Sequence, residues 1–336
     1  MRRWIISSIM LLISILLFYF FILPSLNFNE FLTSLRDTDI LIYGLAVVSL
    51  LISNIFGSLR WSLLMKAVNA TLSQKFTHAL GIFCFGQVAG LIVPSRVGNY
   101  TKVPLVTKLD NISFESALAA VNAETLFDLI YIVCAGIVSI IILSAFLFSL
   151  NIAIPVFVIL ILFILAAVII SMFEISRFKS YLNNLVLVAS DINQNMVVRI
   201  IATLTVKLCD LIQSTRVIFT DGKSVLRLSS FTLIMQLFGI AGLYLVLESV
   251  NSPLPIQEVF AILTISYIVG IASLIPGGLG ASDLSLIALL VYDGIPLTIA
   301  TNIAILWRIA MYLPVLAVVG IYFIQNNVIN QKITGQ

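Results

Sequence analysis

Long apolar runs separated by short polar segments dominate the chain. About 20 apolar residues in a helix cross a bilayer, and six runs are long enough: residues 4–23, 40–59, 116–148, 152–173, 228–250 and 296–324. Two further runs, 79–93 and 256–275, each end in a cluster of proline and glycine. The pattern predicts an all-α polytopic membrane protein with six to eight transmembrane helices and two re-entrant or broken helices.

The two interruptions have related sequences. The first is Pro94-Ser95-Arg96-Val97-Gly98 and the second is Pro276-Gly277-Gly278-Leu279-Gly280. Irregular backbone at membrane depth is tolerated only where protein covers it or where it lines a wet cavity. The two prolines lie 182 positions apart, as do the dipeptides Phe56-Gly57 and Phe238-Gly239. This shared offset predicts an inverted repeat with a substrate site between the broken helices near the midplane.

The chain is interpreted as a single membrane domain, 1–336, made of two halves. The first half covers about 40–173 and the second about 228–324, with a polar connector, 174–227, between them. Apolar residues recur at spacings of three and four between 197 and 218, which predicts an amphipathic helix on the membrane surface. A further transmembrane span in this segment is the alternative.

Composition excludes several classes of function. With 61% hydrophobic and 10% charged residues, the chain is far more apolar than a soluble domain. Its net charge of +3 is too small to favour nucleic acid. Three dispersed cysteines and one histidine, His78, offer no metal-binding motif. We therefore expect no metal, no cofactor and no enzymatic activity, and no special role for His78.

Basic residues predict the orientation. Arg2 and Arg3 precede the first run, the next polar segment is mostly acidic, and Arg60, Lys66 and Lys75 follow the second run. Because cytoplasmic loops carry the excess of Lys and Arg, we expect a multi-pass protein of the plasma or inner membrane with a cytoplasmic N-terminus. Trp61 is expected to anchor at the interface.

Two features of the interruptions could bind an anion. Arg96 could clamp a phosphate or carboxylate, unless it extends to the cytoplasmic surface. In the second interruption, Ser282 is predicted to cap a helix with Asp283 in its first turn. A helix N-terminus inside the membrane would hold an anion, although Asp283 would compete for the same N–H groups; a tight surface loop is the alternative.

Intramembrane charges form a second candidate group. Glu124 and Asp128 lie four residues apart on one helix face. Such carboxylates usually pair with a cation. Arg308, in the corresponding helix of the second half, is the predicted partner, and Arg96 is the other candidate. The pair could serve a substrate path or be purely structural.

The order of these motifs resembles a known family. Arg60-Trp61-x-x-Leu64, Pro94-x-Arg96-x-Gly98, Glu124-x-x-x-Asp128, the PGGLG segment 276–280 and Arg308 follow one another as in the lysylphosphatidylglycerol synthase transmembrane-region family of flippase-like proteins. The resemblance covers about 5–325. It implies two re-entrant segments and lipid translocation, and it places the family motif on Pro94, Arg96, Gly98, Glu124, Asp128, Pro276, Gly277, Gly278, Gly280 and Arg308. Together with Asn99, Ser282 and Asp283, the motif residues of the two interruptions form the predicted substrate site, and Glu124, Asp128 and Arg308 form the predicted charge network.

Two positions depart from the family pattern. Asn99 stands where an acidic residue is usual, and Asp283 replaces a longer glutamate. Both substitutions weaken the case for a proton-coupled step. The last apolar run ends near the C-terminus, so no synthase activity is expected.

The function expected from the sequence is translocation of a lipid or a lipid-linked anionic head group, such as a polyprenyl-phosphate-linked sugar or a modified phospholipid. A small-anion transporter or channel, and a membrane-embedded enzyme acting on lipid phosphates, are the alternatives. A membrane lipid is the expected substrate. A homo-oligomer and a partner lipid-modifying enzyme or glycosyltransferase are further partners to test.

Overall fold

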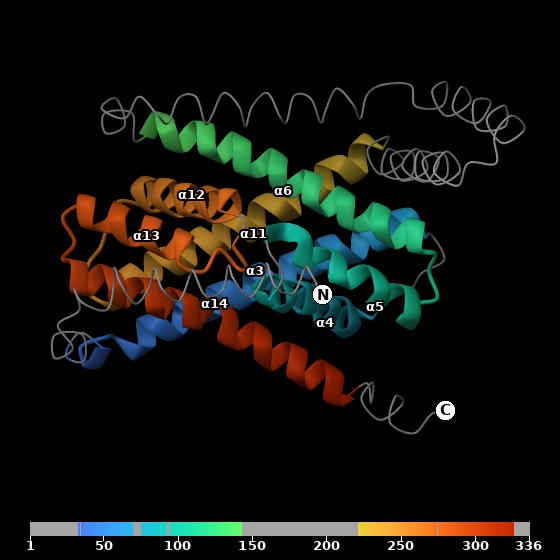
Figure 1. Cartoon of the computed structure of the whole chain (residues 1–336), viewed down its shortest axis with the longest axis horizontal. Helices are drawn as coiled ribbons and strands as arrows, with labels where there is room; N and C mark the ends of the chain where they lie inside the picture. The colour runs from blue at the N-terminus through green and yellow to red at the C-terminus, as the bar shows by residue number, and fades with distance from the viewer. Residues whose placement is uncertain are drawn as a thin grey trace, which may run out of the picture.

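The computed structural model describes residues 33, 35–69, 75–92, 95–142, 221–273 and 275–325, which form helices joined by turns (Figure 1). Four of these helices are long and apolar enough to cross a membrane: α3 (Ile40–Val68), α6 (Phe114–Ile142), α11 (Gly222–Ser249) and α14 (Leu297–Gln325). They correspond to four of the six predicted runs. The runs 4–23 and 152–173 and the amphipathic segment 197–218 lie outside the described residues.

Helices α3 and α11 form the central antiparallel pair. Each begins after an aspartate whose carboxylate accepts hydrogen bonds from two amides of the first turn, Asp39 for α3 and Asp221 for α11. The Asp39 N–H donates to the carbonyl of Ser249, so the start of α3 lies beside the end of α11. Farther along, the hydroxyl of Ser53 donates to the carbonyl of Met235 at 2.8 Å.

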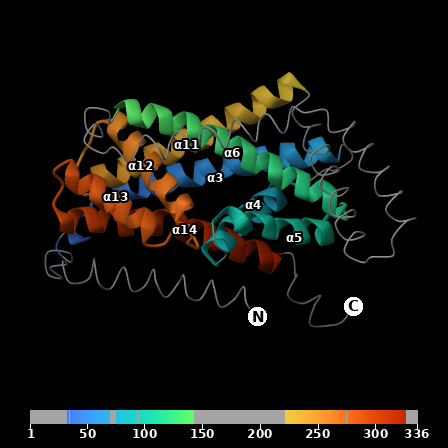
Figure 2. The ribbon, with the colours of Figure 1, turned by 45° about the horizontal axis from the view of Figure 1, so that its top comes forward.

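The shorter helices form two hairpins. The first consists of α4 (Phe76–Ile92), a 3-10 turn, η3 (Ser95–Thr101), and α5 (Lys102–Leu109). Its two open ends are joined where His78 Nε2 lies 2.9 Å from Asp110 Oδ1. The second consists of α12 (Ile256–Ala272) and α13 (Ala281–Tyr292), joined by the turn at 275–280. Figures 1 and 2 both place the two hairpins at opposite ends of the molecule.

The tips of the hairpins meet in the middle of the bundle. The Gly277 N–H donates to the Gly90 carbonyl at 2.8 Å. Gly277 and Gly278 have φ angles of +61° and +64°, a left-handed conformation that glycine adopts without a steric penalty. In the other tip, a Cβ on Gly98 would lie 2.3 Å from the Gly90 Cα. Glycine is therefore required both for the turn and for the close approach of the backbones.

Helix α3 differs from the prediction at its C-terminal end. The predicted run stops at 59, but α3 continues to Val68. Arg60 and Trp61 therefore lie inside the bundle, with 1% and 0% of their surfaces exposed. The prediction that Arg60 belongs to a cytoplasmic loop is wrong, and so is the interface position for Trp61. Apolar residues continue beyond Arg60, so the helix and its burial continue as well.

Helix α11 also begins earlier than expected. It starts at Gly222, inside the predicted connector 174–227, because Asp221 caps it. The rest of that connector lies outside the described residues.

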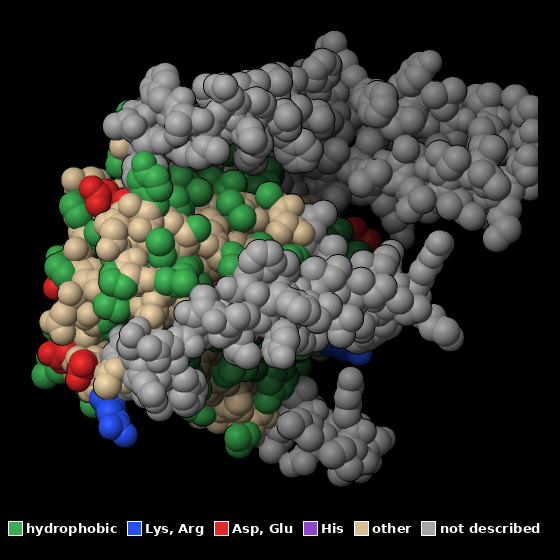
Figure 3. All heavy atoms as spheres, turned by 60° about the vertical axis from the view of Figure 1, so that its left-hand side comes forward, with side chains coloured by type: hydrophobic (Ala, Val, Ile, Leu, Met, Phe, Trp, Pro, Cys, Tyr) green, Lys and Arg blue, Asp and Glu red, His purple; other side chains and the backbone are tan. Residues whose placement is uncertain are grey.

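The two ends of the helix bundle carry opposite surpluses of charge among the described residues. Among the described residues, the end that holds the start of α3 and the base of the α12–α13 hairpin carries carboxylates: Asp37, Asp39, Glu248, Glu258 and Asp293, with Arg36. Burial, and next the nearby Glu258 carboxylate, raise the pKa of Asp293. Figure 3 turns this end forward and shows Asp and Glu side chains among apolar ones. The opposite end carries more cations than carboxylates: Lys66, Lys75, Lys108, Lys223 and Arg227, with Asp110, Glu115 and Asp221.

Candidate functional site

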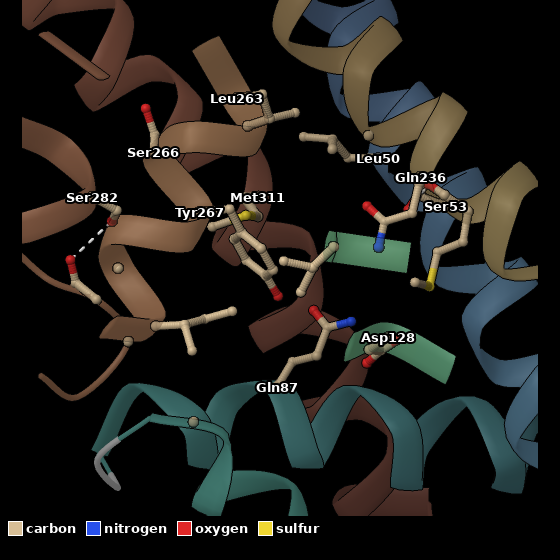
Figure 4. A pocket seen from close by; sticks show the side chains of 18 of the residues that line it. Leu50, Ser53, Gln87, Asp128, Gln236, Leu263, Ser266, Tyr267, Ser282 and Met311 are labelled. Carbon is tan, nitrogen blue, oxygen red and sulfur yellow. Dashed lines mark hydrogen bonds between the residues drawn. The ribbon is translucent and has the colours of Figure 1, made fainter. Parts of the chain in front are cut away.

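A cavity of about 310 Å³ lies between the hairpin tips and the long helices. Residues from all four long helices, from both hairpins and from the 275–280 turn line it. Figure 4 shows the hydroxyl end of Tyr267 and the amide of Gln87 pointing toward one another, with Asp128 beside them. The cavity therefore presents polar groups inside an otherwise apolar bundle.

Most of the predicted site residues that the structure describes line this cavity. They are Asn99, Glu124, Asp128, Gly277, Gly278, Ser282, Asp283 and Arg308. Pro276 and Gly280 belong to the same turn without lining the cavity, and Gly98 packs against α4 instead. Pro94 lies outside the described residues. Arg96 is in η3, but its side chain is not among those described.

One wall of the cavity is a cluster of four charges, formed by Arg60, Lys102, Glu124 and Asp128. Arg60 Nη1 donates to Asp128 Oδ1 at 2.6 Å, and Arg60 Nη2 lies 3.4 Å from Glu124 Oε1. The Arg60 Nη1 group also donates to the hydroxyl of Thr232 in α11. Asp128 has 12% of its side-chain surface exposed, against 1% for Arg60. Asp128 is thus the member of the four-charge cluster that faces the cavity most openly.

Lys102 completes the four-charge cluster from behind. Its ammonium group donates to Glu124 Oε2, and it lies 4.4 Å from the centre of the Trp61 ring. Lys102 is fully buried. A buried charge is tolerated where it is paired and hydrogen-bonded, and the electron-rich ring adds a favourable cation–π contact. Two cations and two carboxylates make the cluster neutral.

The opposite wall holds a second group, formed by Arg308 with Asp283 and Ser282. Arg308 forms a bidentate ion pair with Asp283: Nε donates to Oδ1 at 2.6 Å and Nη2 donates to Oδ2 at 3.1 Å. Its remaining donors reach the Ser282 hydroxyl, the Gly277 carbonyl and the Tyr312 hydroxyl, at 2.6, 3.1 and 3.2 Å. Arg308 therefore ties α14 to α13 and to the glycine turn.

The predicted pairing of Glu124 with Arg308 is wrong. Glu124 pairs with Arg60 and Lys102, whereas Arg308 pairs with Asp283. The two residues line the same cavity, but each has a partner on an adjacent helix or hairpin. The nearer cations satisfy Glu124, and the nearer carboxylate satisfies Arg308.

The predicted helix cap at Ser282 is also wrong. Helix α13 begins at Ala281, directly after Gly280, whose φ of +86° ends the turn. Ser282 lies in the first turn, where its hydroxyl donates to the Gly278 carbonyl. The Asp283 carboxylate accepts the Gly280 N–H at 3.0 Å. As the sequence indicated, Asp283 takes up an amide that could otherwise have bound an anion.

Sequence reasoning missed Arg60 and Lys102 as parts of the site. A signal for Arg60 exists, because apolar residues follow it and extend the helical pattern to Val68. Lys102 gives no such signal, since it lies in a polar stretch after a glycine-containing interruption. Its burial arises only when the first hairpin folds back against α6.

The apolar four-helix framework, the opposed hairpins and the charge-lined cavity define a membrane-embedded helical protein with a polar interior site. The chain belongs to the family described as lysylphosphatidylglycerol synthase TM region, whose pattern it matches over residues 7–318. A comparison with curated protein sequences finds no match. The match to the family pattern confirms the resemblance that the motifs indicated.

Proposed function

We propose that the protein translocates the polar head group of a lipid through this cavity while the lipid tails stay in the bilayer. One observation carries the proposal: two hairpins enter the bundle from opposite ends, and their tips line the same polar cavity. Gly90 belongs to the first hairpin and Gly277 to the second. Apolar outer faces of the long helices suit contact with lipid tails. Polar groups inside suit a head group, which cannot cross hydrocarbon unaided.

In this proposal the hairpins are re-entrant segments. Each hairpin has both open ends at one end of the molecule and its glycine-containing tip in the middle. Such backbone is tolerated at membrane depth because protein covers it or because it lines a cavity. Breaking and re-forming the contact between Gly277 and Gly90 would let the cavity open alternately to the two sides.

An inverted repeat is part of the same proposal, and contacts across the central helix pair support it. Ser53 donates to Met235, 182 positions later. The rings of Phe56 and Phe238, separated by the same offset, stack with centroids 6.1 Å apart. Contacts between equivalent residues are expected where a pseudo-two-fold axis passes between two helices. Transporters built from inverted repeats place their substrate site at that interface.

The ion pairs follow the same pattern with their signs exchanged. In the first half, Lys102 at the start of α5 pairs with Glu124 of the next long helix. In the second half, Asp283 at the start of α13 pairs with Arg308 of the next long helix. Each hairpin is thus connected to the long helix that follows it by one charge pair, which is fully buried in the first half and partly buried in the second.

We further propose that the end with the surplus of cations faces the cytoplasm, following the positive-inside rule. With the predicted span 4–23 crossing once before α3, the N-terminus is then cytoplasmic. We expect a membrane-impermeant maleimide, added outside intact cells, to label Asn251→Cys but not Lys75→Cys in a variant without native cysteines. Both positions are exposed and lie at opposite ends of the molecule, Asn251 in the turn after α11 and Lys75 directly before α4. Labelling of Lys75→Cys alone would contradict this orientation.

A cavity-blocking substitution tests the transport proposal. Gly239 lines the cavity, and a Cβ built on it would meet no atom within 4 Å. We expect Gly239→Phe to fill this space and to abolish the movement of a fluorescent phospholipid between the leaflets of proteoliposomes, measured by chemical quenching of the outer leaflet.

Gly320→Phe is the matched control. Gly320 also has open space around its Cβ position, but it lies on an exposed face of α14 outside the cavity. Wild-type rates in this control beside loss in Gly239→Phe support the proposal. Equal rates in both variants contradict it. Uptake of a soluble anion without lipid movement would also overturn it, in favour of a small-anion transporter.

A further inference from the structure

The charges that the structure describes in and directly behind the cavity balance. Three cations, Arg60, Lys102 and Arg308, face three carboxylates, Glu124, Asp128 and Asp283. Each of the six has a partner of opposite sign. Among the side chains that the structure describes, the cavity therefore presents no surplus of cations for the recognition of an anionic head group.

Arg308 has no hydrogen-bond donor left for an anionic ligand. A guanidinium carries five N–H donors. Those of Arg308 reach two Asp283 oxygens, the Ser282 hydroxyl, the Gly277 carbonyl and the Tyr312 hydroxyl. An anion that binds Arg308 must displace one of these groups. Asp283 is the one whose negative charge the anion would replace.

Displacing Asp283 by an anion alone leaves a second unpaired charge. The side chains of Asp283 and Arg308 are only 16% and 17% exposed. An uncompensated charge at such a site is strongly unfavourable, because little water remains to solvate it. A ligand that brings a cation together with its anion avoids this penalty, since each member of the protein pair gains a new partner.

We infer that the head group is zwitterionic, with an anionic phosphate that binds Arg308 and an ammonium group that binds Asp283. Ligand and protein thus exchange ion-pair partners and the cavity stays neutral. The rings of Tyr267 and Tyr312, which line the same wall, can contact the ammonium group. This inference rests on the proposed lipid translocation and replaces the anionic head group expected from the sequence.

The exchange also links binding to movement of the hairpin tip. The guanidinium that would release Asp283 also holds the Gly277 carbonyl, and the Gly277 N–H holds Gly90 of the other tip. A head group that reorients Arg308 therefore acts directly on the contact between the two tips.

The test uses full-length protein in phosphatidylcholine vesicles with trace amounts of tail-labelled phosphatidylethanolamine or phosphatidylglycerol. The first head group is a zwitterion with a primary ammonium, and the second is an anion. We expect wild type to move the ethanolamine lipid at least about tenfold faster, because only this lipid replaces both charges of the pair. Asp283→Asn removes the carboxylate that needs the ammonium, so the preference should shift toward the glycerol lipid.

Glu115→Gln is the control, because it removes the same charge from an exposed position on α6 and should leave the lipid preference unchanged. Equal or faster movement of phosphatidylglycerol by wild type overturns the inference while leaving lipid translocation intact. An unchanged preference in Asp283→Asn overturns it as well. If wild type moves neither lipid nor the phosphatidylcholine host, the proposed function itself fails.

Discussion

Replacing Arg60 by glutamine is expected to lower the free energy of unfolding by about 3–5 kcal/mol, the cost of breaking a buried ion pair from one side. Arg60 is 1% exposed and contacts both Asp128 and Glu124. Without it, two carboxylates face one remaining cation, Lys102. Thermal unfolding in a mild detergent, followed by the loss of the monodisperse peak in size-exclusion chromatography, measures the effect.

Lys66→Gln is the matched control, because Lys66 lies on the same helix but is exposed near its C-terminal end. It should unfold like wild type, as substitutions of exposed charges have small effects. The double variant Arg60→Gln/Asp128→Asn keeps Lys102 paired with Glu124 and removes the carboxylate that Arg60 left behind. It should recover a large part of the lost stability. A double variant no more stable than Arg60→Gln would show that the charge balance does not govern this cluster.

Arg308→Lys should reduce lipid translocation about a hundredfold. Lysine keeps the charge but not the planar fork that holds Asp283 with two parallel hydrogen bonds. Its three N–H donors also cannot replace the five contacts that Arg308 makes. Hydrogen bonds to charged groups contribute about 1.5–3 kcal/mol each. A loss of about 3 kcal/mol in the transport cycle, equal to one strong or two weak bonds of this kind, corresponds to about a hundredfold, at tenfold per 1.4 kcal/mol.

Arg227→Lys provides the comparison, because Arg227 is an exposed arginine of α11 at the cationic end. The rate of leaflet exchange in proteoliposomes should fall only in Arg308→Lys, while both proteins stay monodisperse and helical by circular dichroism. If Arg308→Lys transports at the wild-type rate, a positive charge alone suffices at this position. The five-donor geometry would then have no part in the mechanism.

The two groups of charges have different tasks in this picture. The four-charge cluster holds α3, α5, α6 and α11 together, and three of its four members are almost fully buried. The Arg308–Asp283 pair is more exposed to the cavity, and Arg308 also donates to the Gly277 carbonyl of the 275–280 turn. We therefore expect substitutions at Arg60 to act mainly on stability and those at Arg308 and Asp283 mainly on transport.

The sequence by itself determined the class of protein and the approximate positions of the four long helices that the structure describes. A helix satisfies all the backbone groups of an apolar run of about 20 residues within the run itself, as lipid requires, and four of the predicted runs appear as α3, α6, α11 and α14. The glycines of the second interruption likewise predicted a turn, since consecutive positive φ angles favour glycine. Both are local properties, which composition and spacing record directly.

Only the tertiary structure decided which charges pair. Arg60 and Asp128 are separated by 68 residues, and Asp283 and Arg308 by 25, and the symmetry argument matched Glu124 with the wrong cation. The choice depends on which side chains the folded hairpins bring within hydrogen-bonding distance. Lys102 shows this most clearly: its sequence surroundings are those of a surface lysine, and the return of α5 against α6 makes it a buried ion-pair partner.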